Sequence, residues 1–464
     1  MSLQHQLDFE LRQRAALLPQ EIIELKALTD KNLQGMGIHQ SQIITVKMVL
    51  DNLQEQQDLV IDSLAPDLPA AEFTEKRGEI EDLLTSTHSI MSVFRYIFSQ
   101  RNESPHYNLL LDIADLVAAE SYIPCIRLSN RWNNRPEEHY REPPLIYLNA
   151  MLSPAAITRR HTLGKVGLQL HAELEEQLPI SVISLPFHDT VAVWTFCSIY
   201  HEVGHLLDND ISLRKELSAA VAAELEQAAP GDLEAAARRV SWEYWMGEMI
   251  ADAFGVALGG AAFGYAMINM LFRNPEEISS LSADKHPNEY VRVFLVIELL
   301  RATKVKALAD AAQEIENTWR GIYPNVPGLT PYVAECKTVA DVLLNKKLAA
   351  FNNEHSLVEL SPRIEADDER VRELAEWLQF ETSRPEPENY PFRLVPAAAQ
   401  LAVQHVEDDF AKQYEGIEKR SLAFLSLIKR PKFLDPAGIS ANRRAYLQDR
   451  VKHMKLTRSA SGQA

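Results

Sequence analysis

Two histidines and a glutamate spaced as HExxH are the side chains in this chain best suited to do chemistry. The segment His201-Glu202-Val-Gly-His205 lies in an apolar run that is predicted to be helical. Residues four apart on a helix project from the same face, so both imidazoles can hold one metal ion. Two imidazoles and a carboxylate suit zinc, and a fourth position left to water makes such a site catalytic. Glu202 is placed beside that water, where it can act as the general base.

The apolar surroundings favour a metal over the alternative of two core histidines satisfied by hydrogen bonds, because unpartnered polar groups are costly to bury. A third ligand must come from elsewhere. A metzincin would need Gly at position 208 and His at position 211, but this chain has Asp208 and Ile211. Asp208 shares the face of the two histidines and could be a ligand or a partner of one. We expect it instead to be a helix-end carboxylate that faces solvent.

A second helical segment downstream carries a pair of carboxylates. Glu248 and Asp252 are four residues apart, and their immediate neighbours are apolar, which makes a solvated acidic face a poor explanation. One carboxylate can bind zinc while the other, a turn along, accepts a hydrogen bond from the far nitrogen of a ligand histidine. This segment is therefore the expected source of the third ligand.

The combination of HExxH with ExxxD on a second helix resembles the gluzincin metallopeptidases. It looks closest to the branch of the prenyl-protein endopeptidases and their soluble relatives, in which ExxAD is followed by HPxxxxR. That third element is also present, as His286-Pro-Asn-Glu-Tyr-Val-Arg292. The resemblance covers roughly residues 125 to 300. A chance HPxxxxR would be a helix start with a surface arginine, and this alternative stays open.

The resemblance implies a role for each matching residue. The zinc ligands would be His201, His205 and Glu248, and the general base and proton donor would be Glu202. The remaining matches would support the site: Asp252 would accept from a ligand histidine, His286 would stabilise the oxyanion, and Arg292 would structure the cleft. Tyr244, which shares the helix face of Glu248, is a second candidate for the oxyanion.

The elements that must position these residues are mostly helices. We expect a mainly α fold with a small β-sheet (α+β), divided into a helical N-terminal region (1–122), a zinc metallopeptidase-like core (123–300), a helical C-terminal region (301–440) and a basic flexible tail (441–464). Short β-prone runs lie at 123–128, 145–148 and 180–185. Residues 145–149 or 180–184 could form an edge strand that aligns an extended peptide.

Residues 253–272 carry no charge and are long enough to cross a bilayer. They are rich in Gly and Ala, and Gly259-Gly260 lies near the middle, so we expect two buried helices and no membrane span. The membrane helices of the prenyl-protease branch are missing. A spacer of 42 residues between His205 and Glu248 is expected to cap or gate the cleft.

Composition limits the partners. The chain has 464 residues, with 47 Lys and Arg against 65 Asp and Glu, a formal charge of −18. No cationic stripe for nucleic acid is expected. Three dispersed cysteines and an acidic N-terminus indicate a cytoplasmic protein.

The function expected from the sequence is therefore that of a zinc-dependent peptidase acting on a soluble protein or peptide. The large helical flanks favour a selective regulatory or defence protease. The alternative is a non-enzymatic helical scaffold with a structural or regulatory zinc site. The oligomeric state is left open.

Overall fold

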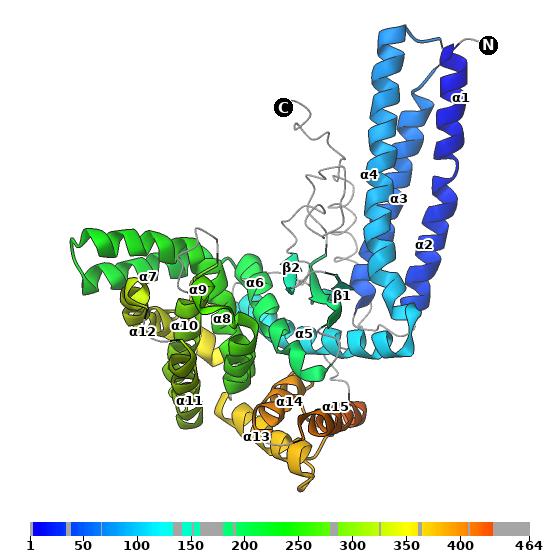
Figure 1. Cartoon of the computed structure of the whole chain (residues 1–464). Helices are drawn as coiled ribbons and strands as arrows, with labels where there is room; N and C mark the ends of the chain where they lie inside the picture. The colour runs from blue at the N-terminus through cyan, green and yellow to red at the C-terminus, as the bar shows by residue number, and fades with distance from the viewer. Residues whose placement is uncertain are drawn as a thin grey trace. The chain divides into compact units, whose positions relative to one another are not determined.

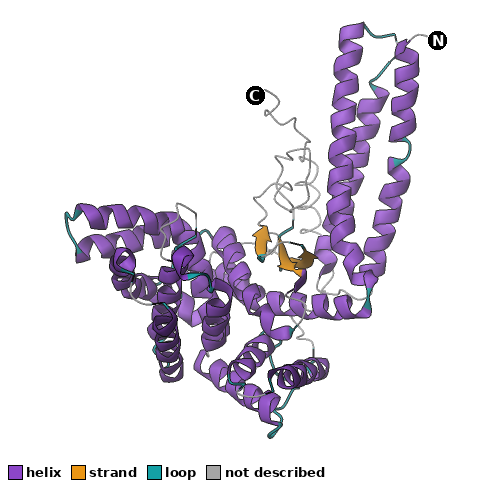
Figure 2. Cartoon of the chain, in the orientation of Figure 1, coloured by secondary structure: helices purple, strands orange, loops and turns teal. Residues whose placement is uncertain are grey.

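The fold is mainly α-helical with one three-stranded sheet, as expected from the sequence (Figures 1 and 2). It is seen in a computed structural model that describes residues 3–33, 39–65, 67–132, 142–150, 153–157, 180–188, 192–278, 286–323, 326–360, 364–406 and 409–429. The tail expected at 441–464 lies outside these residues.

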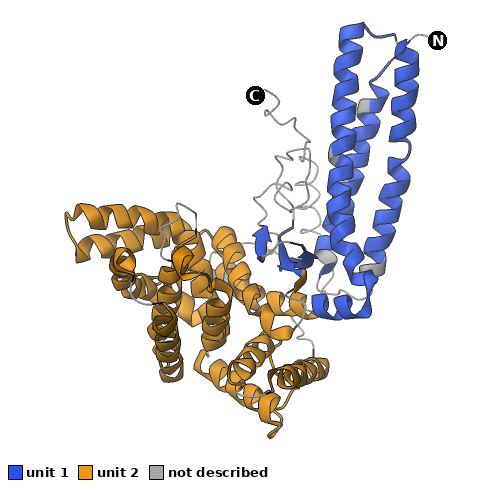
Figure 3. Cartoon of the chain, in the orientation of Figure 1, with its two compact units in different colours: residues 1–112, 137–186, 431–464 blue, residues 113–136, 187–430 orange. Residues whose placement is uncertain are grey.

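The chain forms two compact units (Figure 3). Unit 1 comprises residues 1–112, 137–186 and 431–464, and unit 2 comprises residues 113–136 and 187–430. Helix α5 (Pro105–Trp132) continues through residues 122 and 123, where a boundary between helices and strands was expected. The division into four regions stays a prediction.

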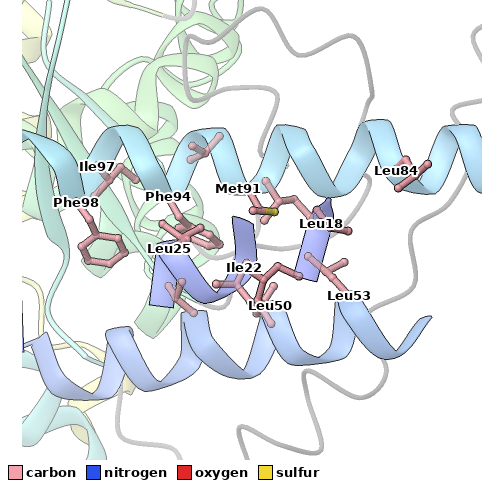
Figure 4. Packing of buried hydrophobic residues seen from close by; sticks show 14 of the residues in the cluster. Leu18, Ile22, Leu25, Leu50, Leu53, Leu84, Met91, Phe94, Ile97 and Phe98 are labelled. Atoms are coloured by element: carbon pink, nitrogen blue, oxygen red, sulfur yellow. The ribbon is translucent and has the colours of Figure 1, made fainter. Parts of the chain in front are cut away.

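Unit 1 contains four helices that bury a shared apolar core: α1 (Leu3–Ala15), α2 (Leu18–Leu33), α3 (Gln40–Asp62) and α4 (Ala70–Glu103). Leu25 of α2, Leu50 of α3 and Phe94 of α4 are all at most 1% exposed and face one another (Figure 4). Apolar residues recur at three- and four-residue spacing along these segments, so each helix presents one apolar stripe to the others.

The sheet of unit 1 has the order β1-β3-β2, with β1 (Leu145–Asn149) parallel to β3 (Val182–Pro186) and β2 (Ala155–Ile157) antiparallel to it. β3 is therefore internal. The outer edge of β1 is occupied by side chains of α4. The Gln100 amide donates to the carbonyl of Leu148 (2.7 Å) and accepts from its N–H (2.8 Å), and Arg101 donates to the carbonyl of Ile146 (2.9 Å).

The sheet thus corrects the expectation that residues 145–149 or 180–184 align a peptide. An incoming strand needs free N–H and C=O groups at an edge. One of the two strands is paired on both sides, and the outer edge of the other is bonded by Gln100 and Arg101.

The strand expected at 123–128 is also wrong, because these residues continue α5. Ile123 and Ile126 are buried there, and Pro124 lies inside the helix. Proline removes one helical hydrogen bond. Packing of the buried side chains compensates for this loss, so the β-branched residues and the proline did not indicate the local structure.

Unit 2 contains the second half of α5, the 3₁₀ turn η5 (Val193–Cys197) and ten further helices. These are α6 (Ser198–Ile211), α7 (Arg214–Ala228), α8 (Leu233–Leu271), α9 (Pro275–Ile278), α10 (Glu289–Ala302), α11 (Lys306–Ile322), α12 (Thr330–Asn345), α13 (Ile364–Phe380), α14 (Leu394–Gln404) and α15 (Phe410–Leu427). α7 lies beside the first half of α8, and α6 packs on α8 further along (Figure 1).

Helix α8 is interrupted at Gly260, whose φ of 54° and ψ of −137° are not helical. The break, together with the burial of residues 253–259 and 261–265 on its two sides, confirms the pair of buried helices expected within residues 253–272. Among the described residues, α8 is also the one helix long and apolar enough to cross a membrane by length and composition, and 67% of its most apolar window is buried inside the protein.

A polar contact joins distant parts of unit 2. The backbone N–H of Arg393 donates to Glu120 of α5 at 2.9 Å, across 273 residues of sequence. The Arg393 guanidinium pairs with Asp367 and also donates to the carbonyl of Leu258, and its own carbonyl accepts from the hydroxyl of Tyr200. Burial raises the pKa of Glu120 to about 7, although Arg393 opposes this shift.

Candidate metal centre

The HExxH segment lies within α6, a helix that is buried along most of its length. Tyr200 and Val203 are fully buried, which fixes the rotation of the helix and aims His201 and His205 at α8. The two imidazole rings lie 4.6 Å apart, centroid to centroid, at nearly a right angle. As predicted from their spacing, both project from one face.

α8 supplies the two carboxylates. Glu248 and Asp252 are 7% and 0% exposed, one turn apart. α6 and α8 come together closely at Gly204, the fourth residue of the HExxH segment. A methyl group at this position would lie 2.7 Å from the Cα of Ala251 and 3.0 Å from its carbonyl oxygen. Glycine therefore permits the backbone approach that brings Glu248 to the histidines.

The three expected ligands meet at one point. Glu248 Oε2 lies 3.4 Å from Nε2 of His201, and Glu248 Oε1 lies 3.5 Å from Nε2 of His205. One ligand atom from each residue lies within 4.8 Å of the others. Ligand atoms about 2.1 Å from a tetrahedral zinc ion would be about 3.4 Å apart. The two imidazoles and the carboxylate are donors that suit a zinc ion, and the two distances from Glu248 match this spacing.

Asp252 orients His201 from behind. Its Oδ1 lies 2.8 Å from Nδ1 of His201, which leaves Nε2 directed at Glu248. A carboxylate on the far nitrogen of a ligand histidine fixes the ring and its tautomer. The role that the family resemblance implied for Asp252 therefore agrees with its position.

Arg292 is buried at the same place and is not a surface residue. It forms a two-pronged ion pair with Asp252, at 2.8 and 2.9 Å, and its Nη2 lies 3.4 Å from Oε2 of Glu248. The same Nη2 is 3.3–3.4 Å from both ring nitrogens of His201, so it lies over the ring rather than on a lone pair. The guanidinium thus holds three site residues together.

The mutual contacts shift the pKa of each group. Burial lowers the pKa of His205 to about 3, with the neighbouring His201 adding to the effect, so its imidazole is neutral and able to bind a cation. Burial would also lower the pKa of His201, but the hydrogen bonds with Asp252 and Glu248 raise it to about 9. Burial opposes ionisation of Glu248, yet the two histidines and Arg292 hold its pKa well below the usual range.

Glu202 and His286 complete the set of predicted residues. Glu202 is 5% exposed. Burial opposes the charge of Arg292, but Asp252, then Glu248, and to a smaller extent Glu202 raise the pKa of its guanidinium. The Nε2 of His286 lies 3.5 Å from Glu248 Oε1, and the His286 side chain is 42% exposed. Asn288, two residues on, caps α10 by accepting from the N–H of Tyr290 and so fixes the start of the helix that carries Arg292.

The prediction that Asp208 faces solvent is wrong. Asp208 is 3% exposed and pairs with Arg214 at 2.8 Å. The guanidinium of Arg214 lies against Gly247, where a methyl group would come within 2.4 Å of Nη2. Asp208 is therefore not a member of the metal cluster, and it fixes an exposed cation beside Glu248.

No family model, curated protein or solved structure matches the chain. The site is accordingly defined by its own geometry. All seven residues selected from the sequence are brought together in unit 2, whereas Gly204, Gly247 and Arg214 were not selected. Glycine in the middle of an apolar helix is the sequence signal that could have identified Gly204.

Proposed function

We propose that the chain is a zinc-dependent peptidase that hydrolyses peptide bonds of a soluble protein or peptide and is related in its mechanism to the gluzincins. The observation that supports the proposal most directly is the position of the Glu248 carboxylate. Its Oε2 lies 3.4 Å from Nε2 of His201, and its Oε1 lies 3.5 Å from Nε2 of His205. When bound, a zinc ion polarises a carbonyl group and lowers the pKa of water to about 7.

The residues of the chain divide the remaining work. His201, His205 and Glu248 hold the ion, and Asp252 with Arg292 keeps His201 and Glu248 in place. Glu202 takes the proton of the attacking water and passes it to the leaving amine. His286 donates to the carbonyl oxygen as negative charge develops there.

Access to the site supports catalysis over the alternative of a structural zinc site. The side chains of His205 and His286 are 20% and 42% exposed, so one side of the cluster is open. A structural site has four protein ligands and is closed. Within the described part of the chain, three residues gather as ligands, and a glutamate lies beside them.

The experiment that tests the proposal compares metal content with peptide hydrolysis. Wild type and Glu202→Gln are expected to contain one zinc per chain by elemental analysis, and His205→Ala none. Wild type alone should cleave a pool of quenched fluorescent peptides and should be inhibited by a chelator.

Glu369→Gln, the same change at an exposed position on α13, is the control and should behave as wild type. Wild-type rates in Glu202→Gln would refute the mechanism. Zinc that resists chelators in a protein without hydrolytic activity would favour the scaffold.

A further inference from the structure

An exposed apolar face on α8 leads to the metal cluster. Leu233, Val240 and Tyr244 are 86%, 67% and 60% exposed, and Ala237 between them is exposed as well. At about 100° per residue these four lie within about 60° of one another around the helix. We call them the α8 stripe. Glu248 follows Tyr244 by one turn, at the edge of the same face.

We propose that the α8 stripe binds the substrate polypeptide of the proposed peptidase, and that it selects for apolar side chains on one side of the cleaved bond. This inference rests on the proposed function. The inference is based on the position of the stripe. It lies on the exposed side of α8 and ends one helical turn from Glu248, a ligand of the proposed metal site.

The sheet strengthens this inference. The two strands expected to align a peptide have no free edge for it, because β3 is paired on both sides and the outer edge of β1 is bonded by Gln100 and Arg101. An exposed surface next to the ligands is then needed to hold the substrate, and the α8 stripe provides one within unit 2.

Charge indicates what kind of chain would bind. The end of α7, the following turn and the start of α8 carry the exposed carboxylates Glu224, Glu226, Asp232 and Glu234. The cations next along α8, Arg238 and Arg239, form ion pairs with Glu335 and Glu226. Glu243 is exposed beside the stripe. An apolar face bordered by carboxylates complements a segment that has apolar residues among basic ones.

The charge and the size of the stripe disfavour an anionic membrane and a second copy of the chain. An anionic membrane attracts basic residues rather than acidic ones. A stable dimer buries about 800 Å² on each partner, and three side chains offer at most a few hundred Å². A substrate polypeptide is the occupant that matches both the size and the charge of the stripe.

Helix geometry sets the spacing that the stripe should recognise. At 1.5 Å per residue, Tyr244, Val240 and Leu233 lie about 6, 12 and 22 Å along the axis from Glu248. An extended peptide advances about 3.3 Å per residue. Because every second side chain of an extended peptide faces the same way, apolar side chains should be preferred about two and four residues from the cleaved bond, and again six to eight residues from it.

The test uses quenched fluorescent peptides with four randomised central residues, flanked by lysines and by Leu or Ser at the fourth, sixth and eighth positions from the central bond on either side. The stripe variant combines Leu233→Gln and Val240→Gln, and it leaves Tyr244 unchanged because Tyr244 is also a candidate for the oxyanion. Phe380→Gln on α13, at a residue 66% exposed, is the matched control. For the Leu peptides, the stripe variant should raise KM about tenfold and leave kcat within about twofold, and the Ser peptides and the control should be unaffected.

A second measurement does not depend on turnover. Binding of a fluorescein-labelled Leu peptide to Glu202→Gln, followed by anisotropy, should weaken about tenfold when the stripe changes are added. If the stripe changes altered neither the KM nor the affinity for the Leu peptide, the proposal for the α8 stripe would be wrong and the proposed peptidase function would stand. A zinc-containing wild type that binds the Leu peptide through the stripe but cleaves none of the peptides would overturn the peptidase and leave the stripe as a peptide-binding surface.

The same variants also test whether a membrane or a second copy of the chain binds the α8 stripe. Co-sedimentation of wild type, but not of the stripe variant, with phosphatidylglycerol vesicles would reassign the stripe to a membrane and overturn the proposal. A dimer in sedimentation velocity that the stripe changes abolish would reassign it to a second copy and overturn the proposal as well.

Discussion

Replacing Gly204 by alanine should separate the two helices that form the candidate metal centre. The new methyl carbon would lie 2.7 Å from the Cα of Ala251. Carbon atoms pack at about 3.5–4.0 Å, so α6 and α8 must move apart by about 1 Å. His201 and Glu248 each lie one turn from this contact. Their 3.4 Å separation would open to about 4.4 Å, beyond the span of a tetrahedral zinc ion.

The magnitude follows from the cost of overpacking, about 1–3 kcal/mol. If about 2 kcal/mol of this strain is relieved by moving the ligands apart, zinc affinity should fall about 30-fold. The affinity can be measured by competition with a chromophoric chelator, and the stability of the metal-free protein by urea unfolding. Both should decrease.

Gly321→Ala is the matched control for this change. Gly321 also lies in a helix, α11, but a methyl group there meets nothing within 4 Å. This variant should bind zinc as wild type does and gain about 0.5–1 kcal/mol of stability. If Gly204→Ala matched Gly321→Ala in both measurements, the argument that the glycine sets the ligand spacing would be refuted.

Two further changes test the buried charges of unit 2. Arg292→Met should lower the free energy of unfolding by about 3–5 kcal/mol in urea titrations, because Asp252 loses its two-pronged partner; a loss below about 1 kcal/mol would contradict the buried pairing. Glu120 has a raised pKa of about 7 in the folded protein, so its contribution to stability is present below about pH 4.5 and is lost as the pH rises through 7. Relative to Glu120→Gln, wild type should lose about 3 kcal/mol over that interval, and parallel curves for the two proteins would show that Glu120 titrates normally.

The candidate site could be predicted from the sequence because its residues follow local rules. The i to i+4 spacing places His201 above His205, and Glu248 above Asp252, whatever the rest of the fold does. The HPxxxxR element added Arg292, whose burial beside Asp252 agrees with a place in the cleft. These inferences needed helix geometry and a motif but no knowledge of which helices pack together.

The predictions that failed depended on contacts that helix periodicity and local propensity do not reveal. Asp208 was expected to face solvent. Its partner Arg214 begins the next helix, and spacing alone does not identify this pair. The outer edge of β1 was expected to be free. It is instead bonded by Gln100, which lies 48 residues earlier in the chain. Ile123 was assigned to a strand by local propensity, which tertiary burial overrides.

The contact between Glu120 and Arg393 has a consequence for synthesis of the chain. Its two residues are 273 positions apart, so at 5–20 residues per second the ribosome needs roughly 15–55 s to deliver Arg393 after Glu120. During that time α5 has emerged without one of its buried partners. Helix α6 also lacks a contact until then, because the Tyr200 hydroxyl donates to the Arg393 carbonyl. Unit 2 therefore completes these contacts only after Arg393 has been synthesised, and nascent chains should depend on chaperones until then.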